Sequence, residues 1–382
     1  MNPALPERIE PSLFGQHDKA VHFYLPSLAG GGAERVFIGL ANHFAARGIN
    51  THLVVNAASG PLRELVSPQV QLHSLGALRT RKAFLPLVAH LRAYRPDVIY
   101  SALFGANLAV LFAEQLARSG ARIIVSERNH FTVLAGHWSW TKRAVFTTLI
   151  RWVYRQAHWV TAVAGGVADD IARVAGLPRE RVAVVYNPAP GAAELADAQS
   201  DPSPDPWFDE AAPVLVAAGR LMKQKDYPSM LAAFAKVRAV RPARLIILGE
   251  GPLLAELEAL AADLGIADSV RFAGFKMNRF SYMARADILL LSSVTEGFPN
   301  VLVEAMACGT PVISTDCAGN GPREILGEHL AAALVPVADI DAMEAAILHE
   351  LDHPSDPRLL EATVARFSID AIADQYARLA DA

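Results

Sequence analysis

The sequence predicts an α/β protein of two domains, each built around a parallel β-sheet. Short, β-rich apolar runs alternate with helical patterns in both halves of the 382-residue chain. A stretch rich in Pro, Asp and Ala, without apolar periodicity, separates the halves at residues 191–213. The halves also differ in charge: residues 1–190 hold 20 Lys and Arg against 11 Asp and Glu, whereas residues 191–382 hold 15 against 28. Such a split favours two separate domains with different partners, the basic one suited to an anionic surface or acceptor.

The expected strands follow one another at βαβ spacing. They are the apolar runs at 20–25, 52–56, 97–103 and 122–126 in the first half, and at 214–219, 244–249, 287–292 and 311–315 in the second. Helical segments between them imply parallel sheets. We therefore expect a Rossmann-like N-terminal domain over 1–190, a linker over 191–213 and a Rossmann-like C-terminal domain over 214–365, with the two domains facing each other across a cleft.

The last segment, 366–382, is predicted to be an amphipathic helix. Ile369, Ile372, Tyr376 and Leu379 recur at three- and four-residue intervals after a possible Ser N-cap. We expect this helix to return to the N-terminal domain.

The composition is that of an ordinary globular protein, with 52% hydrophobic and 19% charged residues. No signal peptide and no apolar run of membrane-spanning length is visible, so a cytoplasmic location is expected. Cys308 and Cys317 are too few for a disulfide framework and lack zinc-site spacing, so we expect inert thiols. Nothing in the composition indicates a nucleic-acid partner.

Residues 292–314 read SSVTEGFPNVLVEAMACGTPVIS and predict a loop and a helix between two buried strands. Glu296 lies in the loop. Gly297 allows close backbone approach, and Pro299 suits a helix start, where its missing N–H costs nothing. The first amides of this helix can bind phosphate. Glu304, farther along the helix, is a carboxylate that can accept hydrogen bonds from two adjacent sugar hydroxyls.

Residues 217–234, AAGRLMKQKDYPSMLAAF, predict a second strand–loop–helix unit. Arg220 follows the strand, and Lys225 precedes the helix. Two cations that converge can hold a diphosphate, Arg through its planar fork and Lys as a point charge. Lys223 is the weaker candidate of the two lysines in this loop.

The first half carries a glycine-rich loop and a polar strand end. Gly30–Gly32 lead into a helix whose first amides can bind phosphate. As dinucleotide fingerprints, this loop and the GEGP at 249–252 are both weak.

Glu127 and His130 follow the strand at 122–126, at the sheet edge where α/β ligand sites form. For His130 a structural role is the alternative, because only geometry identifies a catalytic histidine.

These motifs resemble the retaining GT-B glycosyltransferases of the family 4 type, or group 1, which include sucrose synthases and bacterial polysaccharide and lipid glycosyltransferases. Their hallmark is two Glu separated by seven residues, here Glu296 and Glu304. The resemblance implies that Glu304 binds the donor ribose and that Glu296 faces the transferred sugar. It also implies that Arg220 and Lys225 neutralise the leaving nucleoside diphosphate.

The resemblance extends to further positions. It implies that a GGAE loop, Gly31–Glu34, closes over the donor diphosphate and the acceptor site, and that His130 contacts the transferred sugar. Glu127, from its place at the strand end, is a second catalytic candidate. The other donor-binding positions that it implies are Gly31, Gly32, Gly249, Lys276, Gly297, Phe298, Pro299, Asn300 and Val301.

The implied reaction moves a hexosyl or N-acetylhexosaminyl group from a nucleotide diphosphate sugar, chiefly a UDP-sugar, to a glycan or a polyprenyl-diphosphate-linked acceptor. Residues 317–337 resemble members that act on undecaprenyl-diphosphate-linked glycans and surface polysaccharides, such as lipopolysaccharide. The nucleotide sugar is a co-substrate, and no cofactor or metal is expected. Asp339 and Asp341, the only Asp-x-Asp pair, are explained by helix capping. The alternatives are a GT-B epimerase or phosphorylase, and a catalytically silent scaffold that binds nucleotide sugar.

Residues 137–159 hold four of the five tryptophans together with Lys142, Arg143, Arg151 and Arg155. A segment of this kind can dock on anionic lipid. Peripheral contact with the inner face of the cytoplasmic membrane is therefore one hypothesis, and packing of the same helix inside the domain is the alternative.

Overall fold

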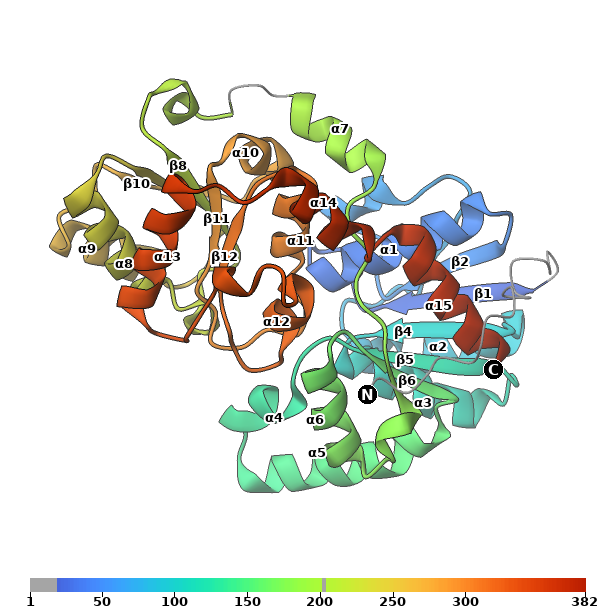
Figure 1. Ribbon diagram of the computed structural model, residues 1–382. Coiled ribbons are helices and arrows are strands. Elements are labelled where there is room, and N and C mark those ends of the chain that lie inside the picture. The colour runs from blue at the N-terminus through green and yellow to red at the C-terminus, as the bar shows by residue number, and fades with distance from the viewer. Residues whose placement is uncertain (1–18, 201–203) are drawn as a thin grey trace. The chain divides into compact units, whose positions relative to one another are not determined.

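The computed structural model describes residues 19–200 and 204–382, which form two compact units (Figure 1). Unit 1 comprises the described residues up to Pro188 together with Ile369–Ala382, and unit 2 comprises Ala189–Ser368. Each unit is a parallel β-sheet flanked by helices. The predicted α/β class with two Rossmann-like domains is confirmed.

Unit 1 contains a seven-stranded sheet in the order β3-β2-β1-β4-β5-β6-β7. Its strands are β1 (Ala20–Leu25), β2 (Asn50–Val55), β3 (Gln71–Ser74), β4 (Val98–Ala102), β5 (Arg122–Glu127), β6 (Trp159–Ala162) and β7 (Val182–Val184). Its α-helices are α1 (Gly32–Ala46), α2 (Thr80–Tyr94), α3 (Phe104–Ala117), α4 (Phe131–Leu134), α5 (Trp140–Val153), α6 (Gly165–Ala175) and α15 (Ile369–Asp381). The central strands are buried along most of their length, which explains their continuous apolar sequences.

Unit 2 contains a six-stranded sheet in the order β10-β9-β8-β11-β12-β13. Its strands are β8 (Val214–Ala218), β9 (Arg244–Leu248), β10 (Val270–Gly274), β11 (Ile288–Leu291), β12 (Val312–Thr315) and β13 (Leu334–Val335). Its α-helices are α7 (Ala192–Ser200), α8 (Tyr227–Val240), α9 (Leu254–Asp263), α10 (Arg279–Arg285), α11 (Asn300–Ala307), α12 (Gly321–Leu326), α13 (Ile340–Asp352) and α14 (Pro357–Ala365).

All eight expected strands are present, within two residues of their expected bounds. The sequence did not signal β3, β6, β7, β10 or β13. Of these, β7 and β13 have only three and two residues, and β3 and β10 are mostly not buried. The expected linker at 191–213 also differs, because it contains helix α7, which packs against α10 in unit 2. A helix this short depends on tertiary packing rather than on its own propensity, so no local pattern indicated it.

Helix α15 returns to unit 1, as the sequence predicts (Figure 1). Its Ile372, Tyr376 and Leu379 side chains are fully or almost fully buried in the core. The Tyr100 hydroxyl of β4 donates a 2.8 Å hydrogen bond to the Tyr376 carbonyl. The amphipathic pattern therefore completes a core whose other residues lie more than 180 positions earlier in the chain. In the described part of the chain, no helix is both long and apolar enough to cross a membrane.

Four histidines and a tyrosine stack beside the β1, β2 and β3 strands of unit 1. The rings of His22 and His52 lie 4.3 Å apart, and those of His90 and Tyr94 lie 4.4 Å apart. His52 Nδ1 lies 2.9 Å from His73 Nε2, and His90 Nε2 lies 3.2 Å from His22 Nδ1. Burial, followed by repulsion from the neighbouring histidines, lowers the pKa of His22 to about 2 and the pKa values of His52 and His90 to about 4.

We expect the free energy of unfolding to decrease as the pH falls below the ordinary histidine pKa of 6.5. The unfolded chain binds protons near that pH, whereas the folded cluster resists protonation until the pH approaches about 4, so acid favours unfolding. Urea midpoints measured across this range test the expectation. The variant His73→Gln removes one titrating ring and should lose less stability over the same range; a pH profile identical to the parent's would contradict the assignment.

Candidate functional site

The loop after β8 brings Gly219, Arg220 and Lys225 to the carboxyl end of the unit 2 sheet. A Cβ on Gly219 would lie 3.1 Å from Lys225 Cε, and a Cβ on Gly249 would lie 2.0 Å from the Gly219 carbonyl oxygen. Gly249 also has a φ of +140°, which other residues rarely adopt. The two loops thus pack backbone against backbone. Tyr227, at the start of α8, fixes this arrangement through a 3.0 Å hydrogen bond from its hydroxyl to the Gly219 carbonyl.

Lys225 and Glu296 form an ion pair in unit 2. Lys225 Nζ donates to Glu296 Oε1 at 2.6 Å, and the Ser293 hydroxyl donates to the same oxygen at 2.7 Å. The two side chains are only 19% and 11% exposed. Gln224 reinforces the contact by donating from Nε2 to the Thr295 carbonyl at 2.8 Å. The structure therefore joins the two predicted loops through their key charged residues.

Glu304 lies on α11 and is held by a residue that the sequence did not indicate. Arg279, at the start of α10, donates from Nε and from one terminal nitrogen to the two Glu304 carboxylate oxygens at 2.7 and 2.6 Å. The Arg279 and Glu304 side chains are 17% and 10% exposed. A two-point contact of this kind fixes the orientation of the carboxylate plane.

The GFPN segment forms the turn into α11. Pro299 is the N-cap residue, so the helix begins at Asn300 and Glu304 lies just over one turn from its start. Gly297 is closely covered, because a Cβ on Gly321 would lie 2.1 Å from its carbonyl oxygen. Phe298 packs against Phe367 with ring centroids 5.3 Å apart. The first backbone N–H groups of an α-helix have no hydrogen-bond partner within the helix. The turn before Val301 is therefore suited to binding an anion.

Two predicted cations of unit 2 are less constrained. Arg220 is exposed, and no hydrogen bond or ion pair of its side chain is found within residues 19–200 and 204–382. Lys276, in the loop before α10, places its ammonium 5.9 Å from the centre of the Tyr282 ring. Among the described residues, no hydrogen bond or ion pair joins the side chain of Arg220 or Lys276 to Lys225, Glu296 or Glu304.

In unit 1, Gly31 is the N-cap of α1 and Gly32 is its first residue. A Cβ on Gly31 would lie 2.1 Å from Glu34 Oε2, so the Glu34 carboxylate folds back over the glycine. The Ser27 hydroxyl also donates to Glu34, at 3.4 Å. A side chain at position 31 would displace the flexible end of Glu34, so the geometry of the GGAE loop favours glycine there without strictly requiring it.

Glu127 does not lie at the surface of unit 1, contrary to expectation. It is 3% exposed, and its carboxylate accepts hydrogen bonds from Asn107, at 2.7 Å, and from the Tyr154 hydroxyl. Burial raises its pKa to about 7, although both hydrogen bonds act in the opposite direction. As the last residue of β5, it directs its side chain between α3 and the turn after α5. The geometry fits an internal group that orders the strand end rather than one that touches substrate.

His130 caps the short helix α4, and its Nδ1 lies 3.8 Å from Asp170 Oδ2. Burial lowers the pKa of the imidazole, and Asp170 opposes that effect. No described residue accepts or donates a hydrogen bond at its Nε2. The ring thus lies beside Asp170 without a hydrogen bond to it, and its Nε2 is buried.

Two family models match the chain, one in each half. The model described as Glycosyltransferase Family 4 matches residues 30–190, and the one described as Glycosyl transferases group 1 matches residues 212–353. The chain belongs to the GT-B glycosyltransferases of the family 4 type. It is a glycosyltransferase enzyme, and neither the epimerase nor the silent scaffold is favoured.

This glycosyltransferase is similar to several named proteins over most of its length. It is 26% identical over 369 residues to the lipopolysaccharide core biosynthesis glycosyltransferase LpsE of Rhizobium meliloti, covering 94% of this chain and 98% of LpsE. It is 26% identical over 343 residues, 84% of this chain and 87% of the relative, to the N-acetylgalactosamine-N,N'-diacetylbacillosaminyl-diphospho-undecaprenol 4-alpha-N-acetylgalactosaminyltransferase of Campylobacter jejuni. The structure of Anabaena HepE in complex with UDP and glucose has the same fold, with a TM-score of 0.74 at 20% identity over 94% of this chain and 98% of HepE.

Sequence reasoning missed Arg279 and Ser293, the residues that hold the two glutamates of the glycosyltransferase. Ser293 stands three residues before Glu296, a spacing that can indicate a local hydrogen-bond partner. Nothing in the sequence near Arg279 indicates that it pairs with Glu304. Asp339 caps α13 by accepting from the Ala342 amide at 2.9 Å, which confirms the capping interpretation. Among the described residues, no cluster of three or more His, Cys, Asp or Glu side chains is arranged to hold a metal ion.

Proposed function

We propose that this glycosyltransferase moves a hexosyl or N-acetylhexosaminyl group from a UDP-sugar to a glycan or a polyprenyl-diphosphate-linked acceptor, with retention at the anomeric carbon. The observation that carries the proposal is the pairing of the two predicted glutamates with cations in unit 2, Glu296 with Lys225 and Glu304 with Arg279. The relatives support the substrate classes: HepE was solved with UDP and glucose, and the name of the Campylobacter jejuni relative includes a diphospho-undecaprenol acceptor.

The protein would bind the donor through the negative charge of its diphosphate and through its ribose. Lys225, with Arg220 free to move toward it, would neutralise the leaving diphosphate, assisted by the first amides of α11. A diphosphate at Lys225 would compete with Glu296 for the ammonium and leave that carboxylate to face the transferred sugar. Glu304 would accept hydrogen bonds from the ribose hydroxyls while Arg279 holds its plane.

Unit 1 would contribute little to removing the proton from the acceptor hydroxyl. Glu127 is buried and hydrogen-bonded, which argues against its use as the base that activates the acceptor. The leaving phosphate would accept the acceptor's proton on the same face of the sugar, which gives retention. His130 would contact the transferred sugar once its Nε2, which is buried here without a partner among the described residues, becomes accessible, and the Gly31–Glu34 loop would close over the diphosphate.

The test is a panel of UDP- and GDP-sugars offered with polyprenyl-diphosphate-linked acceptors, with and without EDTA. We expect acceptor-dependent release of nucleoside diphosphate, an α-linked product from an α-linked donor, and turnover that EDTA leaves unchanged. A β-linked product would refute retention. Donor binding without turnover on any acceptor would refute the proposed acceptor class.

Arg279→Gln is expected to weaken UDP binding by about tenfold or more, because Glu304 loses the charged partner that orients it. Calorimetric titration with UDP measures the effect. Arg285→Gln is the matched control, since Arg285 lies on the same helix and its guanidinium contacts Asp209 and the Phe208 carbonyl instead. Equal UDP affinity in parent and Arg279→Gln would show that the Arg279–Glu304 pair is only structural.

We also propose that the enzyme acts in the cytoplasm as a peripheral protein on the inner face of the membrane. Helix α5 supports this, since Trp140 and Trp152 are 80% and 55% exposed and Lys142, Arg143 and Arg151 lie on the same helix. Exposed indoles beside cations are typical of surfaces that enter the interface of an anionic bilayer. Packing inside the domain accounts for Ile150 and Val153, which are fully buried, and in part for Trp152, whose ring lies 5.7 Å from that of Phe112, but not for Trp140.

A further inference from the structure

Arg128, directly after β5 in unit 1, is a buried arginine without an anionic partner among the described residues. It is 7% exposed. Its Nη1 donates to the Asn187 side-chain oxygen, and its guanidinium carbon lies 4.8 Å from the centre of the Phe37 ring on α1. Nε and Nη2 are buried, and no described residue accepts a hydrogen bond from either. A buried charge with two unsatisfied donors is costly, so it indicates that a partner from outside the chain binds there.

The unpaired edge of the Arg128 guanidinium is one that can hold an oxyanion at two points. The N–H groups of Nε and Nη2 point to the same side of the planar group, so they can donate to two oxygens of one carboxylate or phosphate. Arg279 uses the same two nitrogens to hold the Glu304 carboxylate. Arg128 therefore presents the same fork without its anion.

The carboxylates near Arg128 are engaged elsewhere. Glu127 accepts hydrogen bonds from α3 and from the turn after α5, and Glu34 accepts one from Ser27. Burial lowers the pKa of the guanidinium, and Tyr376, Glu127 and Glu34 act in the opposite direction. None of these groups is within ion-pair distance of Arg128, so the chain itself does not supply the anion in this conformation.

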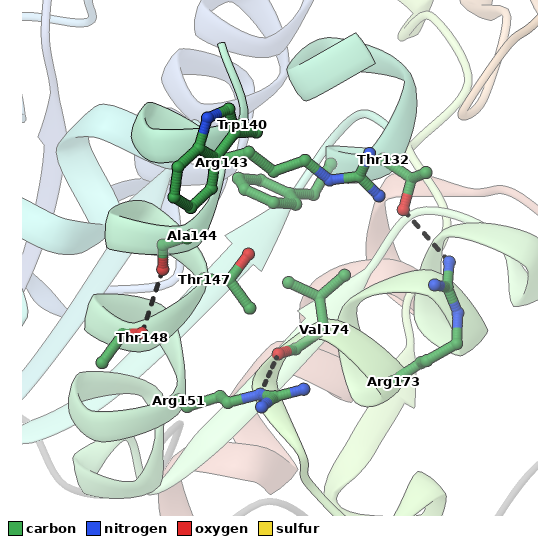
Figure 2. Close-up of a pocket in the computed structure, with 10 residues that line it drawn as sticks. Thr132, Trp140, Arg143, Ala144, Thr147, Thr148, Arg151, Arg173 and Val174 are labelled. Carbon is green, nitrogen blue, oxygen red and sulfur yellow. Dashed lines mark hydrogen bonds between the residues drawn. The ribbon is translucent and has the colours of Figure 1, made fainter. Parts of the chain in front are cut away.

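Other arginines of unit 1 need no ligand, because water reaches them. Arg143, Arg151 and Arg173 border a hollow of about 480 Å³ between α5 and α6 (Figure 2). All three are exposed, so solvent can satisfy their donors whether or not a ligand is present. The Nε and Nη2 atoms of Arg128 have almost no exposed surface, so solvent does not do the same for them.

Helix α1 can supply further donors in the region of Arg128. It begins at Gly32, runs for 15 residues, and receives no side-chain hydrogen bond from its N-cap residue, Gly31. The first backbone N–H groups of a helix, together with its dipole, favour an anion and suit a phosphate. Phe37, below the Arg128 guanidinium, is in the second turn of this helix, and Glu34 in the first turn is among the charges that act on Arg128.

We propose that Arg128 binds a phosphate group of a substrate of this glycosyltransferase through Nε and Nη2. The inference rests on the proposed function, because the nucleotide sugar and the polyprenyl-diphosphate-linked acceptor are the molecules that bring phosphate to the protein. Both carry a diphosphate, so the shared chemistry is a phosphate that offers two oxygens to the fork. Because the fork is covered, a phosphate that binds it must displace part of the surrounding protein.

The test is a set of calorimetric titrations with UDP, farnesyl diphosphate and uridine, on the parent and on Arg128→Gln, Arg128→Lys and Arg122→Gln. Arg122 is the matched control, because it begins the same strand at the opposite end and its side chain forms no ion pair with a described residue. We expect Arg128→Gln to lose about tenfold or more in affinity for one of the two diphosphates. Arg128→Lys keeps the charge but not the fork, so it should lose less. Arg122→Gln should match the parent, and uridine, which has no phosphate, should bind all four proteins equally.

The three ligands separate the possible outcomes. A loss confined to UDP assigns the phosphate to the donor, and a loss confined to farnesyl diphosphate assigns it to the acceptor. Equal affinity of the parent and Arg128→Gln for both diphosphates would overturn the role of Arg128 and leave the proposed function in place. An equal loss for uridine would overturn it too, because the effect would then not depend on phosphate. If the parent bound neither diphosphate, the proposed substrates would be wrong and this assignment with them.

Thermal unfolding distinguishes a ligand-binding arginine from one that only supports the fold. Because the charge of Arg128 is buried and unpaired, Arg128→Gln should unfold at the temperature of the parent or above it. A lower unfolding temperature together with unchanged affinity for both diphosphates would show that Arg128 serves only the fold.

Discussion

Lys225→Ala should reduce kcat by about 100-fold or more while the protein remains folded. Lys225 Nζ is the partly buried cation of unit 2 closest to the predicted sugar-facing carboxylate, at 2.6 Å from Glu296 Oε1. Positive charge that meets the leaving diphosphate stabilises the transition state more than the ground state, so its removal should lower kcat more than donor affinity. Steady-state kinetics with a saturating acceptor, together with the unfolding temperature, measures both effects.

Lys223→Ala is the control for this substitution. Lys223 lies in the same short turn and removes the same charge, but it is exposed and forms no ion pair with a described residue. We expect its kcat to stay close to the parent value. If both variants lost activity equally, the effect would come from the net charge of the loop, and the specific role of Lys225 would be wrong.

Glu304→Gln should raise the donor KM by about tenfold to a hundredfold, with a smaller change in kcat. The substitution keeps the shape of the side chain but removes the charge that would accept hydrogen bonds from two ribose hydroxyls. Because the ribose is remote from the reacting carbon, its loss should weaken ground-state and transition-state binding alike. Donor KM values and UDP affinity test this; Glu328→Gln, at an exposed position of unit 2, is the neutral control.

The Glu304→Gln substitution is also expected to affect the stability of the fold. Glu304→Gln leaves Arg279, only 17% exposed, without its anionic partner, so the unfolding temperature should fall as well. The double variant Arg279→Gln/Glu304→Gln removes both charges and should recover part of that stability but none of the donor affinity. Recovery of donor affinity in the double variant would mean that Glu304 acts on the fold and not on the ribose.

The sequence by itself determined the fold class, eight strands that are continuous apolar runs and the C-terminal helix. These features have local signals: a buried parallel strand is a continuous apolar run, and an amphipathic helix repeats its apolar residues every three or four positions. The paired-glutamate segment is also local, since Glu296 and Glu304 stand within one loop and helix. The resemblance that identified the family therefore rested on residues close together in the sequence.

The tertiary structure alone decided which charged groups meet. Strands β8 and β11 are neighbours in the unit 2 sheet, so the loops after them converge and join Lys225 to Glu296 across 71 residues. Helix α10 returns from the edge strand β10 to pack against α11, which brings Arg279 to Glu304 across 25 residues. The sequence places Glu127 at the end of a strand, where α/β ligand sites form, but its side chain turns into the core. Sheet order and side-chain direction are long-range properties, and no local period encodes them.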